Sequence, residues 1–226
     1  MKASLDTNVI IHFYRAGLQD ILFDFFDEGV EIYEQIRYVE LEHHGKDVLA
    51  QVDADIASGR MRLYTDQKLR NLAVYRIFDH HVRENRNLFG TGDLGEVYAI
   101  SLAQTLGTYS LVTDDTKQGG PYMSLLQFDD EVMPFSFADV LILRYITGQA
   151  DERQTVVDFE KINQASQMNW SFRSHLSRFI TRFLRDPYRE DDKKWFLSLA
   201  EEHGVHIKSK FISLRKLLDT NQEGKA

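Results

Sequence analysis

The amino-acid sequence predicts an α/β protein with a central, mostly parallel sheet, followed by a helical C-terminal region. Two observations lead to this fold class. Over residues 1–148, short apolar segments alternate with helical patterns, and strands separated by helices pair in parallel and are covered on both faces. Over residues 149–226, apolar residues recur only at three- and four-residue spacing, which is typical of helices. We therefore expect a three-layer α/β/α sandwich and then a helical extension.

The expected strands are short apolar runs, the first ending at Asp6 and a later one at Thr113-Asp114-Asp115. They cover residues 3–5, 31–33, 109–112 and 132–135. The run at residues 62–64 is too short to assign. Helical spacing of apolar residues predicts helices at residues 18–26, 38–43, 48–57, 66–87, 93–106 and 137–147.

The composition changes near Gly148, which follows an apolar helical run and resembles a helix C-cap. Residues 1–150 contain 13 Lys or Arg and 23 Asp or Glu, a net charge of −10, whereas residues 151–226 contain 14 and 12, a net charge of +2. We therefore place a domain boundary at residue 148. Beyond it, helices are expected at residues 151–167, 169–185, 190–203 and 208–219, with Pro187 stopping the second.

The composition also excludes several classes of protein. The chain has no cysteine, which excludes a disulfide scaffold, a thiolate zinc site and a cysteine nucleophile. Its longest apolar runs, such as residues 140–143, are far shorter than the roughly 20 residues of a membrane-spanning helix. The N-terminus reaches a carboxylate at Asp6, too early for a signal peptide. We therefore expect a cytoplasmic protein without a membrane segment.

The net charge of −8 is unusual for a protein that coats nucleic acid, because phosphate neutralisation favours basic proteins. It does not exclude a nucleic-acid enzyme, because catalytic metal sites are themselves built from carboxylates. The overall charge alone therefore leaves the partner open.

Carboxylates are expected to gather at one edge of the predicted sheet. In an open parallel sheet the reactive groups lie beyond the carboxyl ends of the strands. Two strand ends and two helix beginnings carry the acids Asp6, Asp114, Asp115, Glu40, Glu42, Asp93 and Glu96. Two unit charges about 5 Å apart repel by roughly 3 kcal/mol at an effective dielectric constant near 20. A divalent cation removes that penalty, and Mg²⁺ or Mn²⁺ can activate water and offset the charge of a phosphodiester.

Four blocks of the sequence resemble the motifs of the PIN-domain nucleases. The run Asp6-Thr7-Asn8 is similar to the opening Asp-Thr-Asn motif of that family, and Glu40-Leu41 stands where the family has a helix-borne Glu followed by Leu. Residues 92–100 are similar to the Gly-Glu helix start of one branch, and Thr113-Asp114 matches the strand that ends in Thr-Asp. The order and spacing of the blocks agree over roughly residues 2–148. The resemblance thus implies a PIN-like fold there.

The resemblance implies a ribonuclease that depends on Mg²⁺ or Mn²⁺ and acts on single-stranded RNA. The acidic tetrad would be Asp6, Glu40, Glu96 and Asp114. Asp6, Glu96 and Asp114 would bind the metal, with Asp115 beside them, and Glu40 would hold a second metal or orient water. The polar supports of the crevice, on the substrate side, would be Thr7, Asn8 and Thr113. Many relatives are toxins that a small antitoxin holds inactive, so candidate partners are RNA, an antitoxin protein and a second copy of the chain.

Each acid also has a purely structural interpretation. Asp6 could cap the turn after its strand, a helix-borne Glu could belong to a solvated face, and Glu96 could complete a capping box. The choice therefore stays open within three pairs, which are Glu40 and Glu42, Asp93 and Glu96, and Asp114 and Asp115. We favour the members Glu40, Glu96 and Asp114.

One helix of the C-terminal region carries arginines in an approximately helical register. They are Arg173, Arg178, Arg182, Arg185 and Arg189, and apolar residues occupy the other side of the helix. One interpretation is a stripe that tracks phosphates, in which Arg178 and Arg182 bind RNA. The other is a docked helix whose arginines pair with the acidic first domain.

Three functions fit these patterns. The first is a Mg²⁺- or Mn²⁺-dependent endoribonuclease, of the toxin type if an antitoxin exists. The second is a regulatory or RNA-binding module of PIN fold with weak or no catalysis. The third is a receiver-like phosphoacceptor domain built on Thr113-Asp114-Asp115, which lacks a suitable lysine after the last strand, where the chain has Met133-Pro134-Phe135. The complete acidic set favours the enzyme.

Overall fold

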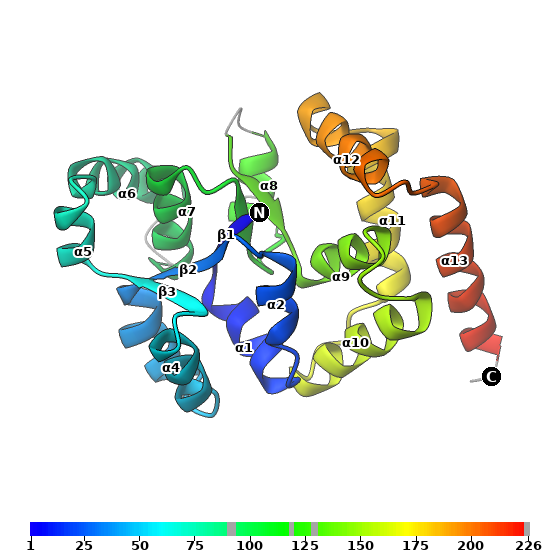
Figure 1. Cartoon of the computed structure of the whole chain (residues 1–226), viewed down its shortest axis with the longest axis horizontal. Helices are drawn as coiled ribbons and strands as arrows, with labels where there is room; N and C mark the ends of the chain where they lie inside the picture. Colours follow the sequence, from blue (N-terminus) through cyan, green and yellow to red (C-terminus); the bar gives the residue numbers. More distant parts are fainter. Residues whose placement is uncertain (90–93, 118–119, 128–130, 224–226) are drawn as a thin grey trace. The chain divides into compact units, whose positions relative to one another are not determined.

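The computed structural model describes residues 1–89, 94–117, 120–127 and 131–223 (Figure 1). The chain divides into two compact units, Met1–Phe137 and Ala138–Ala226, which we call the sheet unit and the helical unit. The predicted helix cap at Asp93 and the preceding Gly92 lie outside the described residues.

In the described part of the chain, the sheet unit contains a sheet of five parallel strands. These are β1 (Lys2–Leu5), β2 (Gly29–Tyr33), β3 (Met61–Tyr64), β4 (Ser110–Val112) and β5 (Met133–Phe135). The strand order is β3-β2-β1-β4-β5, with every pair parallel. The chain builds outwards from β1 to β3 and then crosses to the other side for β4 and β5. The order therefore reverses between β1 and β4, and this switch point is where open parallel sheets bind ligands.

Burial explains why these short runs form strands. Successive residues of a strand point to opposite faces, yet all of Ala3, Ser4 and Leu5 are buried, as are all residues of β4 and β5. Both faces of the central sheet are therefore covered, as parallel sheets require. In Figure 1, α6 and α7 lie on one side of the strands and α2 and α4 on the other. The predicted α/β class and parallel sheet are thus confirmed.

The helices of the sheet unit differ from the prediction at three places. They are α1 (Thr7–Arg15), α2 (Asp20–Phe25), η1 (Ile36–Glu40), α3 (Leu41–His44), α4 (Leu49–Ala57), α5 (Asp66–Asn71), α6 (Tyr75–Phe89), α7 (Leu94–Leu106) and α8 (Pro121–Gln127). The prediction missed α1 and α8, and η1 is a π-helix. The single helix expected over 66–87 is two helices, because Ala73 adopts a left-handed conformation (φ 60°) that no α-helix can continue.

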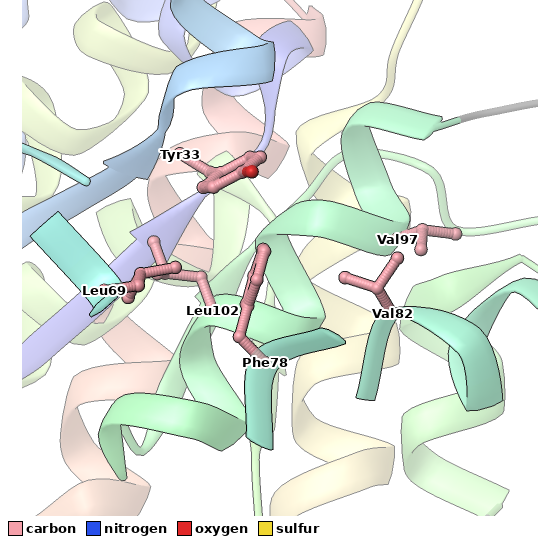
Figure 2. Close-up of a cluster of buried hydrophobic side chains, with 6 residues drawn as sticks. All are labelled: Tyr33, Leu69, Phe78, Val82, Val97 and Leu102. Carbon is pink, nitrogen blue, oxygen red and sulfur yellow. The ribbon is translucent and has the colours of Figure 1, made fainter. Parts of the chain in front are cut away.

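A buried apolar cluster fixes α7 against β2 (Figure 2). Its members come from β2, α5, α6 and α7 and are Tyr33, Leu69, Phe78, Val82, Val97 and Leu102. The ring of Tyr33 lies 4.6 Å from that of Phe78 and 4.9 Å from that of Tyr98 between centroids. Because α7 begins at Leu94, this packing also determines where Gly95 and Glu96 lie.

The helical unit is formed by α9 (Phe137–Ile146), whose first residue closes the sheet unit, α10 (Glu152–Ala165), α11 (Phe172–Ile180), the π-helix η2 (Thr181–Arg185), α12 (Glu190–Glu202) and α13 (Ile207–Glu223). Asp151 and Ser171 cap α10 and α11 by accepting backbone N–H bonds at their N-termini. No helix in the described ranges combines the length and apolar composition needed to cross a membrane.

The division between the units lies earlier than the boundary at residue 148 that composition predicts. The reason is α9, whose polar side chains pair with later helices of the helical unit. Arg144 lies 3.5 Å from the Asp158 carboxylate on α10, and the hydroxyl of Tyr145 donates to Glu152 at 2.8 Å. The helix that a charge count assigns to the sheet domain therefore belongs to the helical unit.

Candidate functional site

The carboxyl edge of the sheet brings Asp6 and Asp114 together at the switch point. Asp6 directly follows β1, and Asp114 follows β4 after one intervening residue, Thr113. Leu5 pairs with Val112, so Asp6 and Thr113 stand at the same level of the sheet. Both carboxyl residues are buried, with Asp6 1% and Asp114 8% exposed. Asp6 and Asp114 are more than a hundred residues apart in the sequence, yet they lie at neighbouring strand ends, as expected for a parallel sheet.

Asp6 is held from two directions. Its Oδ1 accepts the N–H of Thr7 at 2.7 Å, so it caps α1 from an extended conformation. Its Oδ2 accepts the hydroxyl of Thr113 at 3.2 Å, and the same hydroxyl oxygen accepts the N–H of Asp115 at 3.3 Å. The turn-capping interpretation of Asp6 is therefore observed, and it holds the carboxylate at the strand edge.

Asp114 is held by a backbone amide and a histidine. Its Oδ1 accepts the N–H of Phe137 at 2.9 Å, and its Oδ2 lies 2.8 Å from Nδ1 of His12 on α1. The His12 side chain is 15% exposed, and its ring meets that of Phe137 edge-on at 6.3 Å. Sequence reasoning did not identify His12. An N-cap at Asp6 followed by apolar residues at helical spacing is the signal that would have revealed α1, which carries His12.

Gly95 marks the place where α7 approaches Glu40 and Thr7. A Cβ atom built on Gly95 would lie 3.3 Å from Cδ of Glu40 and 3.3 Å from Oγ1 of Thr7, which is closer than nearly all real contacts of this kind. The backbone at the start of α7 therefore comes close to both side chains, and glycine makes this approach possible. The neighbouring Glu96 is 3% exposed. The Thr7 hydroxyl is also buried and makes no hydrogen bond to any described residue.

The two glutamates of the second sequence block have different surroundings. Glu42 lies 3.1 Å from the Arg37 guanidinium, which also binds both oxygens of Asp53. Glu40 ends the π-helix η1 and lies against Gly95. Of the two, Glu40 is the one that lies against the start of α7, close to the same point as the Thr7 hydroxyl. π-Helical turns are rare in proteins overall, and many of those that occur lie at functional sites.

Asp115 takes part in a turn. Its Oδ1 accepts the N–H of Lys117 at 3.1 Å, and its Oδ2 lies 3.4 Å from the Lys117 ammonium. A Cβ atom on Gly120 would lie 3.0 Å from the same Oδ1. The Asp115 carboxylate thus stabilises the turn after β4, while the Asp114 carboxylate contacts His12. Asn8, predicted on the substrate side, is exposed in the first turn of α1.

The oxygen atoms at this edge of the sheet are of the chemical type that binds a hard cation. Carboxylate oxygens of Asp6 and Asp114 and the buried Thr7 hydroxyl are the ligands that Mg²⁺ and Mn²⁺ prefer. Among the described residues, however, no group of three or more His, Asp or Glu side chains is arranged to hold a metal ion. The residues thus fit the cation chemically, without forming a complete three-carboxylate cage.

The predicted arginine stripe is divided between exposed and buried side chains, because Arg173, Arg178 and Arg185 are exposed whereas Arg182 is buried. Arg182 is buried, with its guanidinium 3.0 Å from Asp192 and 3.9 Å from Asp139, so it does not reach outward as a phosphate contact would. Arg189 also pairs with Asp192, at 2.7 Å, and Arg173 pairs with Asp219. Asp192 and Asp219 belong to the helical unit, and so does Asp139, although Asp139 lies within residues 1–148, the predicted first domain.

Arg178 differs from these paired arginines. It is exposed, and its guanidinium lies 3.0 Å from the ring nitrogens of His175. Of the two arginines predicted to bind RNA, Arg178 alone remains accessible.

Comparison of the chain with known proteins finds no matching family model, no matching curated protein and no matching solved structure. The geometry and the sequence motifs therefore carry the functional argument.

Proposed function

We propose that the sheet unit is a PIN-like, three-layer α/β/α domain that hydrolyses RNA phosphodiester bonds with Mg²⁺ or Mn²⁺. The observation that carries this proposal is that Asp6 and Asp114 lie at the ends of the adjacent strands β1 and β4, where the Thr113 hydroxyl donates to Asp6. Two buried carboxylates at adjacent strand ends repel each other, and a divalent cation offsets that repulsion. The sequence resemblance supplies the substrate class, single-stranded RNA. A cytoplasmic location, an antitoxin protein and a second copy of the chain belong to the same proposal.

The roles of the side chains follow from their contacts. Asp6 and Asp114 would hold the cation, which supplies an activated water and neutralises charge on the phosphodiester. The Thr113 hydroxyl orients Asp6, and His12 orients Asp114 through its Nδ1. The third carboxylate would come from Glu96 or Glu40, both near Gly95, and it would have to move toward the cation, because the described residues form no group of three metal ligands. Thr7 would line the same crevice.

The acidic site is tested by RNA cleavage with single-residue variants. Full-length protein would be incubated with single-stranded RNA and Mn²⁺, beside the variants Asp6→Asn and Asp114→Asn. Because both residues would hold the cation, each variant should lose activity by at least about a hundredfold. Asp115→Asn and Glu42→Gln remove neighbouring carboxylates that bind Lys117 and Arg37, so both should retain activity. Equal cleavage by wild type and Asp6→Asn would eliminate the site.

A second function is compatible with the described residues, among which no three-ligand group is found. In this alternative the sheet unit is an RNA-binding or regulatory module with weak or no catalysis, and the strand-end acids are structural. Wild-type protein that binds RNA but does not cleave it with Mn²⁺ or Mg²⁺ would support this alternative. A gel-shift titration of the same RNA provides the binding measurement.

A further inference from the structure

The helical unit contains an open cavity of about 440 Å³, bordered by η2, α12 and α13 with the end of α11. Apolar side chains form most of its lining, among them Leu197, Phe211 and Ile212. Ligand sites of proteins have volumes of about 300–1,000 Å³, so the cavity is large enough for a small molecule. All of its lining residues lie within the helical unit.

Three cations surround this apolar surface. They are Arg185 on η2 and Lys208 and Arg215 on α13, all exposed. In the described part of the chain none of the three forms an ion pair, and the residues that line the cavity include no Asp or Glu. Other arginines of the same segments do find acids, since Arg182 pairs with Asp192. The cavity therefore carries positively charged side chains at its border and no acidic side chain in its lining.

Apolar side chains at the cavity remain exposed to water. Leu197 is 43% exposed and Ile212 is 56% exposed. Covering them with an alkyl chain would be favourable at about 25 cal/mol per Å² of buried apolar surface. A ligand with an apolar chain would cover these side chains, and an anionic group on the same ligand would pair with the three cations.

We propose that this cavity binds a free amphiphilic anion, a medium-chain alkyl carboxylate. The alkyl chain packs on Leu197, Phe211 and Ile212, and the carboxylate faces the cations. This site goes beyond RNA cleavage and does not depend on it, because its residues belong to a different unit from the strand-end acids.

The proposal is tested by titrating the full-length protein with octanoate and following amide NMR signals. Saturable shifts confined to α11–α13 are expected. 1-Octanol, which keeps the chain without the charge, and acetate, which keeps the charge without the chain, should each bind at least about tenfold more weakly. Shifts spread over the whole chain, or equal binding of octanol and octanoate, would overturn the proposal.

Variants separate the two halves of the recognition. The combined change Arg185→Gln, Lys208→Gln and Arg215→Gln should weaken octanoate binding by about tenfold or more, because three charge contacts are lost. Lys216→Gln is the matched control, since Lys216 is an exposed cation on α13 that does not line the cavity, and its affinity should be unchanged. Ile212→Gln changes an exposed apolar side chain and should also weaken binding. Unchanged octanoate affinity in the triple variant would overturn the proposal.

Two further probes test other classes of partner. Vesicles of anionic phospholipid and an acidic amphipathic peptide would be titrated under the same conditions. Binding of either probe without saturable octanoate binding would assign the cavity to a membrane surface or a protein partner, and would overturn the small-ligand proposal.

Discussion

The strand edge of the sheet unit and the helical unit bury carboxylates in different ways. At the strand edge of the sheet unit, Asp6 accepts bonds from a backbone N–H and a hydroxyl, and Asp114 from a backbone N–H beside His12. In the helical unit, Asp192 lies 3.0 Å from Arg182 and 2.7 Å from Arg189, and Asp158 lies 3.5 Å from Arg144. Both sets of acids are almost completely buried.

This difference separates two uses of a buried acid. An acid matched by a guanidinium is neutralised within the fold, so its role is to hold helices together. An acid held by a hydroxyl and amide groups keeps its orientation but also much of its negative potential, which a cation can lower. The comparison therefore predicts that the helical-unit acids matter for stability and the strand-edge acids for cation binding.

The largest expected effect is the loss of Arg182. Arg182→Met keeps the length of the side chain but leaves Asp192 and Asp139 buried without this guanidinium. Breaking a buried ion pair in this way costs about 3–5 kcal/mol, so the unfolding midpoint of the helical unit in urea should fall strongly. The exposed Arg178→Met is the control and should change stability by less than about 0.5 kcal/mol. Equal stability of the two variants would show that the buried acids of the helical unit do not depend on Arg182 for stability, which contradicts the comparison.

Cation binding should stabilise the sheet unit. A metal that binds only the folded state raises the free energy of unfolding by about 2.7 kcal/mol at a hundredfold excess over its Kd. Thermal unfolding with and without Mn²⁺ measures this rise. Asp6→Asn should abolish it while keeping the cap of α1, because Asn caps helices as well as Asp. Asp115→Asn should retain the full rise, and its loss there would mean that the turn acid, not the strand-edge pair, holds the cation.

A smaller effect is expected at His12. His12→Phe removes the nitrogen that lies 2.8 Å from Asp114, leaving one carboxylate oxygen without that contact at a cost of about 1–2 kcal/mol. The variant should also lower Mn²⁺-dependent cleavage by about ten- to a hundredfold, as loss of an orienting partner does. His12→Asn can still donate a hydrogen bond, so it should recover part of the stability and part of the cleavage activity. A His12→Phe variant with normal stability and normal cleavage would show that the contact is incidental.

Strands were more predictable than helix ends. An apolar run that is buried on both faces, such as residues 3–5, is visible in the sequence because each of its side chains meets the core. The break between α5 and α6 is not visible in this way, because the residue at the turn is Ala73 rather than glycine or proline. Its left-handed conformation allows Leu69 and Phe78 to join one cluster with Tyr33, which is a tertiary condition.

The candidate site was predictable to the extent that topology determines it. Asp6 and Asp114 follow from the rule that parallel strand ends share an edge. The pairing of Glu42 depends on the position of Arg37, and the turn contact of Asp115 depends on the Lys117 amide, and the sequence shows neither. A helical arginine register shows charge but not its partner, so the burial of Arg182 beside Asp192 could not be foreseen.

The smallest effect on stability is expected at Gly95, where it tests whether Glu40 belongs to the strand-edge group. Gly95→Ala gains up to about 1 kcal/mol of helix propensity in α7, but its Cβ would lie 3.3 Å from both Glu40 and Thr7. The two effects oppose each other, so we expect a change below about 1 kcal/mol in the free energy of unfolding together with a clear loss of Mn²⁺-dependent cleavage. Adding Thr7→Ala removes one of the two close atoms and should restore part of that cleavage. If Gly95→Ala cleaves RNA normally, Glu40 can be displaced without consequence and is only a neighbour of the strand-edge acids.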